Sequence, residues 1–119
     1  MRRSVHNPQP SEAAIQTAVL QHWRIFGVPG SLVAAIPNAN AHGQPGLTSG
    51  LYDLLVIGGS VRIGFIELKR IGGRTSQAQR DFADILSRAG IRHAIAFGRD
   101  EPITILEQWG ICRETSRER

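Results

Sequence analysis

The stretch "LYDLLVIGGSVRIGFIELKR", residues 51–70, decides the fold because it holds two apolar segments joined by strong turn residues. Both segments have strand composition, and the Gly-Gly-Ser turn at residues 58–60 predicts a β-hairpin. The segments are apolar at odd and even positions, which is typical of central strands that are covered on both faces. Glu67 and Lys69 therefore stand out as charges at the end of an apolar strand.

The hairpin register brings charged side chains together. If residues 58–60 form a three-residue loop, Asp53 faces Phe65 on the partner strand. Side chains alternate along a strand, so Glu67 lies on the same face, diagonal to Asp53, and Lys69 follows two residues further along that face. The sequence thus predicts that Asp53, Glu67 and Lys69 converge at one end of two paired strands.

Two carboxylates near a core repel each other and lose hydration, so they need a cation, a proton or a salt bridge. A hard divalent cation such as Mg²⁺ takes oxygen ligands and keeps several waters. The backbone carbonyl of Leu68 offers a third oxygen. Lys69 would then hold or activate a metal-bound water or stabilise a phosphate, and this set of groups hydrolyses phosphodiesters.

A simple salt bridge from Lys69 to Asp53 and Glu67 is the alternative interpretation. We favour the metal site because the three residues share a face in an apolar setting, and because Lys69 is the only lysine of the chain.

Composition limits the class of protein. A chain of 119 residues is enough for one domain with one modest core. The single Cys112 and the spacing of the histidines exclude a transition-metal cluster. The formal charge is +4 and almost all cations are arginine, which suits a nucleic-acid partner. No apolar run is long enough to span a membrane and the start lacks a signal-peptide core, so we expect a cytoplasmic protein without a membrane partner.

The remaining chain predicts helices around a sheet. A helix begins after the N-cap Ser11 and ends at Gly27, and a second begins after Ser76 and ends at Gly90. Residues 31–37 and 91–97 are expected strands, and residues 101–110 a closing helix or turn. We predict an α/β domain at residues 11–110 between a flexible arm, residues 1–10, and a polar tail, residues 111–119.

The order of short motifs resembles a known nuclease superfamily. "GLYD", a short hairpin and "IELK" resemble the PD-(D/E)xK nucleases. "SEAAIQTAVLQHW", "IPN", "GGRTSQAQRDF" and "LSRAG" resemble one branch, the virus-type replication-repair nuclease (VRR-NUC) domain, over residues 11–110. One departure is Tyr52, which stands where the family commonly has proline.

The resemblance implies a restriction-endonuclease-like core of order αβββαβ, with a mixed central sheet flanked by helices. Asp53 and Glu67 match the metal ligands, Lys69 the catalytic lysine, Glu12 an acidic residue that approaches the metal, and Gln79 the glutamine that opens the helix after the lysine. Both latter residues also have structural interpretations: Glu12 suits a helix first turn, and Ser76 and Gln79 form a capping box.

The implied function is a divalent-metal-dependent deoxyribonuclease that uses Mg²⁺ or Mn²⁺. Stand-alone members resemble Holliday-junction resolvases, so the resemblance implies a homodimer that cuts branched DNA, as in repair, and by analogy a bacterial or phage source. Two alternatives stay open: a non-catalytic nucleic-acid-binding module, and a nuclease for duplex ends or restriction-type sites. We expect Arg70, Arg74, Asn38 and His42 to contact nucleic acid, and we expect no nucleotide cofactor, since no phosphate-binding loop is present.

Overall fold

The computed structural model describes residues 9–37 and 48–115. A four-stranded sheet of order β1-β2-β3-β4 forms its centre, with β1–β2 and β2–β3 antiparallel and β3–β4 parallel. The sheet is therefore mixed, as predicted. The elements in chain order are α1 (Glu12–Phe26), β1 (Leu32–Ala35), β2 (Leu54–Gly58), β3 (Arg62–Lys69), α2 (Gln77–Arg88), β4 (Arg92–Phe97) and α3 (Asp100–Gln108).

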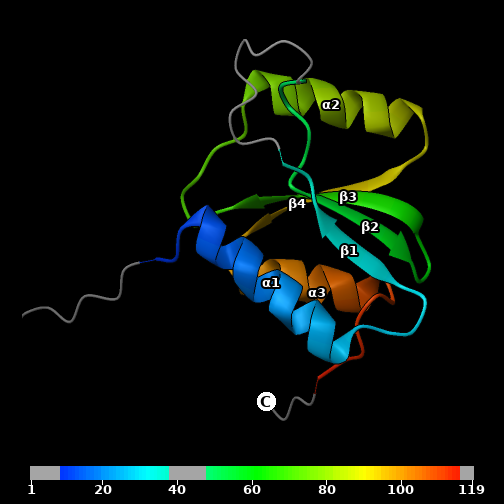
Figure 1. Ribbon diagram of the computed structural model, residues 1–119. Coiled ribbons are helices and arrows are strands. Elements are labelled where there is room, and N and C mark those ends of the chain that lie inside the picture. Colours follow the sequence, from blue (N-terminus) through cyan, green and yellow to red (C-terminus); the bar gives the residue numbers. More distant parts are fainter. Residues whose placement is uncertain (1–8, 38–47, 116–119) are drawn as a thin grey trace, which may run out of the picture.

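The elements form three layers (Figure 1). Helices α1 and α3 contact each other and cover one face of the sheet, while α2 lies against the opposite face. The predicted αβββαβ order is confirmed, and the C-terminal segment adds α3 as the closing helix. Because β2 and β3 are the central strands, their residues are apolar on both faces.

The main core lies between the sheet and the α1–α3 layer. The Ser11 side chain accepts a hydrogen bond from the Ala14 N–H, which caps α1 as predicted. From α1, Ile15 and Val19 are fully buried in this core. Their sheet and α3 partners are Val33, Leu54, Val56, Ile66, Leu68 and Leu106.

The hairpin register differs from the predicted one. Gly58 pairs with Arg62 and Leu55 with Phe65, so the loop is residues 59–61 and the prediction that Asp53 faces Phe65 is wrong by two residues. Continuing the observed register places Asp53 directly opposite Glu67 instead of diagonal to it. A shift of two residues keeps every side chain on its predicted face, so the two carboxylates still meet.

The C-terminal segment after α3 packs against the body of the domain. Ile111 and Cys112 are buried, so the predicted tail beginning at residue 111 starts too early. Cys112 forms a bridge with Gly27 at the end of α1, and the Val28 N–H donates to the Ile111 carbonyl at 2.8 Å. The last residues of the described chain thus close the core beneath the sheet.

The hairpin tip is bound to the same segment. The Ser60 N–H donates to the Trp109 carbonyl at 2.9 Å. Gly59 has φ +56°, and a Cβ there would lie 2.3 Å from that carbonyl oxygen. Glycine is therefore required at this contact by backbone conformation and by space. In residues 9–37 and 48–115, no helix is long and apolar enough to cross a membrane.

Candidate active site

A cleft of about 780 Å³ opens where β1 and β3 end. Its lining comes from the start of α1, the residues after β1, the segment before β2, the end of β3 and the first turn of α2. Five of the predicted site residues line it together: Glu12, Asp53, Glu67, Lys69 and Gln79. Side chains from five separate segments of the chain therefore converge in one hollow.

Asp53 lies directly before β2, and a hydrogen bond from the β3 backbone fixes its carboxylate. The Leu68 N–H faces the β2 side of β3 and donates to Asp53 Oδ2 at 2.8 Å. A longer β2 would offer a backbone acceptor at this place, and the Asp53 carboxylate replaces it. This hydrogen bond engages Oδ2 and holds Asp53 against β3 beside Glu67, where the two carboxyl groups lie close enough to share a hydrogen bond.

Glu67 is 2% exposed and its two oxygens have different surroundings. Oε2 accepts a hydrogen bond from Gln79 Nε2 at 2.8 Å and lies 3.1 Å from Lys69 Nζ. Oε1 is buried and has no hydrogen-bond partner among the residues that the structure describes. A buried carboxylate oxygen without a partner is costly, which indicates that a donor or a cation belongs there.

The electrostatics of the pair point the same way. Burial and then the charge of Asp53 raise the pKa of Glu67 to about 7. Burial also raises the pKa of Asp53, although the Leu68 N–H partly opposes this. Lys69 is 6% exposed and supplies one positive charge against two carboxylates. The ionised site therefore has a net negative charge in a poorly hydrated place, which favours a bound cation.

Gln79 connects the helix start to this pair. Its Oε1 accepts the Ser76 N–H at 3.1 Å, and the Ser76 hydroxyl accepts the Gln79 N–H at 3.1 Å. The predicted capping box is thus present. Because the amide oxygen is used by the cap, the amide nitrogen is left to donate to Glu67. Gln79 serves the helix and the site at once.

The donor set fits a hard cation that keeps water ligands. Within the described part of the chain, no three His, Cys, Asp or Glu side chains come close enough to form a metal site by themselves. Besides the carboxylates of Asp53 and Glu67, such a cation would need a carbonyl and water to complete its shell. The Gly98 N–H bonds the Lys69 carbonyl on the β4 side, so the Leu68 carbonyl is on the opposite side, toward Asp53.

Glu12 lies at the rim of the cleft. Its side chain is exposed, and its charge contributes to the raised pKa of Asp53. Gln16, four residues later on the same helix face, also lines the cleft and was not among the predicted residues. The spacing from Glu12 is the signal that would have identified it. The role of Glu12 as a further ligand stays a prediction.

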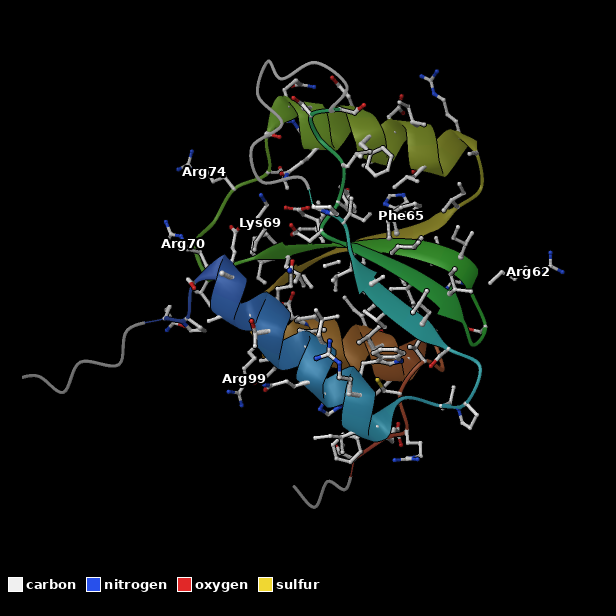
Figure 2. All side chains as sticks on the ribbon, viewed as in Figure 1. Arg62, Phe65, Lys69, Arg70, Arg74 and Arg99 are labelled. Carbon is white, nitrogen blue, oxygen red and sulfur yellow. The ribbon has the colours of Figure 1, made fainter. Side chains whose placement is uncertain are left out.

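Two exposed arginines lie at the same end of the molecule as Lys69. Figure 2 shows Arg70 and Arg74 at the same end of the molecule as Lys69, with Arg62 at the opposite end. Both Arg70 and Arg74 are exposed, as a phosphate contact requires. The other two residues expected to contact nucleic acid, Asn38 and His42, lie outside the described residues.

Two further residues, Gly50 and Tyr52, pack the segment before β2 against α2. Tyr52 is fully buried, with its ring edge-on to Phe82 of α2 at 5.3 Å between centroids. This packing anchors the chain just before Asp53. Gly50 has φ +92°, and a Cβ there would lie 2.4 Å from the Ala78 carbonyl, so this segment packs directly on the first turn of α2.

Comparisons with known proteins identify the fold. No family model matches the sequence, and no curated protein does. Among solved structures, a "VRR_NUC domain protein" is similar with a TM-score of 0.71 and 21% identity, covering 91% of this chain and 100% of that one. A "VRR_NUC domain" is similar with a TM-score of 0.58 and 21% identity, covering 82% and 94%. The chain therefore has the fold of the VRR-NUC domains, as the sequence motifs predicted.

Proposed function

We propose that this chain is a divalent-metal-dependent nuclease that hydrolyses phosphodiester bonds in DNA. The observation that carries the proposal is Oε1 of Glu67, which is buried beside Asp53 and Lys69 in the cleft and accepts no hydrogen bond from a donor among the residues that the structure describes. Two carboxylates alone would be explained by a salt bridge to Lys69. That salt bridge occupies Oε2, however, and leaves Oε1 for another partner.

In this proposal Asp53 and Glu67 would hold Mg²⁺ or Mn²⁺ through their carboxylates, with the Leu68 carbonyl and Glu12 as further ligands. The bound metal supplies Lewis acidity and lowers the pKa of a water nucleophile. Gln79 fixes Oε2 of Glu67, so the carboxylate cannot rotate away from Asp53. Lys69, held at 3.1 Å from Glu67, is placed to orient the water or to neutralise charge on the phosphate.

Branched DNA as the preferred substrate and a homodimer as the active form extend the proposal. A two-fold dimer carries two sites related by symmetry, which suits a junction with two strands to cut. Arg70 and Arg74 would contact phosphates on either side of the scissile bond. The competing proposal is a binding module that does not cleave.

The test is cleavage of labelled four-way junction and linear duplex DNA with Mg²⁺, Mn²⁺ or EDTA. We expect the wild type to cut the junction only when metal is present. The cleavage rate should fall at least a hundredfold in Lys69→Ala, and also in Lys69→Met, whose side chain is close to lysine in length but carries no charge. Equal cutting of both substrates would remove the branch preference and keep the chemistry. Tight binding without cutting in either metal would favour the binding module.

Metal binding is tested separately from activity. Mn²⁺ should raise the melting temperature of the wild-type protein, since a ligand that binds only the folded state stabilises it. Asp53→Asn should lose most of this rise, while Arg62→Ala, altered at the far end of the molecule, should keep it. An equal rise in all three proteins would place the metal elsewhere.

A further inference from the structure

Gln16 lines the cleft with a side-chain amide that is not engaged. The residue is half-buried on α1, and its amide forms no hydrogen bond within residues 9–37 and 48–115. The other glutamine of the cleft, Gln79, is fully engaged, since its oxygen accepts the Ser76 N–H and its nitrogen donates to Glu67. Gln16 therefore offers both a donor and an acceptor to a ligand that enters the cleft.

The fold holds Gln16 in a fixed place on one wall of the cleft. The first turns of α1 and α2 lie on opposite sides of the sheet end, because the two helices cover opposite faces of the sheet (Figure 1). On α1, Ile15 and Val19 are fully buried and anchor the helix on either side of Gln16. Gln16 lies one helical turn beyond Glu12, about 6 Å along the axis.

The cleft has few positive groups with which to meet a nucleic acid. Among the side chains that line it, Glu12, Asp53 and Glu67 are acidic. Lys69 is the only cation of this lining, and it is paired with Glu67 at 3.1 Å. A DNA strand carries a negative charge at each phosphate, so these acids repel every phosphate that a metal ion does not neutralise. A neutral donor can bind such a phosphate without adding to the repulsion.

A neutral amide suits this position better than a cation would. An arginine one turn from Glu12 would pair with that carboxylate and compete with a metal ion for the acids of the cleft. The amide of Gln16 leaves the carboxylates free and can still donate to a phosphate oxygen. The neighbouring lining residues at the end of β1, Ala35, Ile36 and Pro37, have no side-chain donor. Gln16 is thus the neutral side-chain donor of this part of the lining.

We propose that Gln16 binds the phosphate next to the scissile phosphate on the same DNA strand, by donating from Nε2 to a non-bridging oxygen. The proposal rests on the proposed nuclease function and adds a subsite for the DNA backbone to it. In that function the metal and Lys69 contact the scissile phosphate, so a donor one turn beyond Glu12 meets the neighbouring phosphate. A contact to the backbone positions the strand and gives no preference for a base.

The test is DNA binding measured by fluorescence anisotropy in EDTA and in Ca²⁺. The probe is a labelled four-way junction in which one phosphate at a time, past the branch point, is replaced by a neutral methylphosphonate. We expect wild-type affinity to fall about tenfold at the phosphate that Gln16 contacts, as for one hydrogen bond to a charged group. Gln16→Ala should bind the unmodified junction about tenfold more weakly and should not respond at that phosphate, while other contacted phosphates should affect both proteins alike.

Matched variants complete the design. Gln16→Glu keeps the size of the side chain and replaces the donor by a carboxylate, so it should weaken binding more than Gln16→Ala does. Gln21→Ala changes the same residue type on the same helix, at an exposed position outside the cleft lining, and should bind as the wild type does. Mn²⁺ should raise the melting temperature of Gln16→Ala as much as that of the wild type, because the phosphate contact is separate from the metal ligands.

The outcomes separate the subsite from the nuclease function. If Gln16→Ala responds to every replacement as the wild type does, the subsite is overturned, even if Lys69-dependent cleavage occurs in Mg²⁺. A sensitive phosphate that is not next to the cut position overturns it too, as does the loss of the Mn²⁺ effect in Gln16→Ala. A phosphate that depends on Gln16, without cleavage in Mg²⁺ or Mn²⁺, supports the backbone contact and rejects the nuclease. A protein that does not bind the junction overturns both.

Discussion

At the scale of single residues, Glu67 concentrates the chemistry of this protein. One oxygen is held by Lys69 and Gln79 and the other has no partner among the described residues. Burial makes the ionised form costly, and a cation would relieve that cost. Protonation of this one carboxylate should therefore affect both the stability of the fold and the binding of a cation.

Stability without metal should fall as pH rises from 5 to 8. The folded protein holds the Glu67 proton up to a pKa of about 7, whereas the unfolded chain releases it near 4.5. Between these values the folded state binds more protons, so the free energy of unfolding decreases with pH, by an amount on the order of 2 kcal/mol. Urea unfolding in EDTA at pH 5 and pH 8 measures this difference. Glu67→Gln should lose most of the slope, and an equal slope in that variant would contradict the assignment.

Tyr52→Phe should stabilise the protein by about 1 kcal/mol. The Tyr52 hydroxyl is buried and finds no hydrogen-bond partner within residues 9–37 and 48–115, while its ring packs on Phe82. The substitution removes the unsatisfied group and keeps the ring. Thermal or urea unfolding gives the result, and a loss of stability would mean that the hydroxyl has a partner in solution.

At the scale of elements, the N-terminus of α2 joins folding to the site. Ser76→Ala and Gln79→Ala each break the capping box, and each should cost about 1 kcal/mol of stability. Only Gln79→Ala also removes the hydrogen bond to Glu67, so only that variant should weaken Mn²⁺ binding and slow cleavage. The two variants are each other's control. Equal cleavage activity in the two variants would mean that Gln79 caps the helix and has no role in the site.

The hairpin shows how much sequence reasoning can reach. The strand pattern predicts which face Asp53 and Glu67 share, because an even shift in register preserves the faces. It fails on the loop, which is residues 59–61, because Val61 has strand character but belongs to the turn and is buried. Local residue preference cannot show that a turn residue packs into a core. The site role of Gln79 was expected only from the family resemblance, because the capping box by itself explains the residue.

At the scale of the whole molecule, the hairpin tip and the residues after α3 support each other. Gly59→Ala should cost at least 3 kcal/mol, because it adds steric overlap with the Trp109 carbonyl to the strain of a positive φ. Gly30→Ala is the matched control: its φ is +84° with nothing within 4 Å, so it should cost only about 1 kcal/mol. Similar melting temperatures for the two variants would show that the backbone around Gly59 and Trp109 can move apart at little cost.

This long-range contact marks the limit of prediction from sequence. The tail was predicted from residue 111 because the last residues are mostly polar. Ile111 and Cys112 are nevertheless buried, since Gly27 and Val28, from a distant part of the chain, offer them backbone partners.

The bridge between Gly27 and Cys112 has a consequence for how the protein is made. The Arg113 N–H also donates to the Phe26 carbonyl at 2.8 Å, so the end of the first helix pairs with residues that are synthesised much later than the helix itself. Until residues 111–113 leave the ribosome, the apolar side of α1 cannot be fully covered, and the nascent chain is open to chaperones and to aggregation. A chain stalled within α3 would carry Asp53, Glu67 and Lys69 and still lack the scaffold that holds them together.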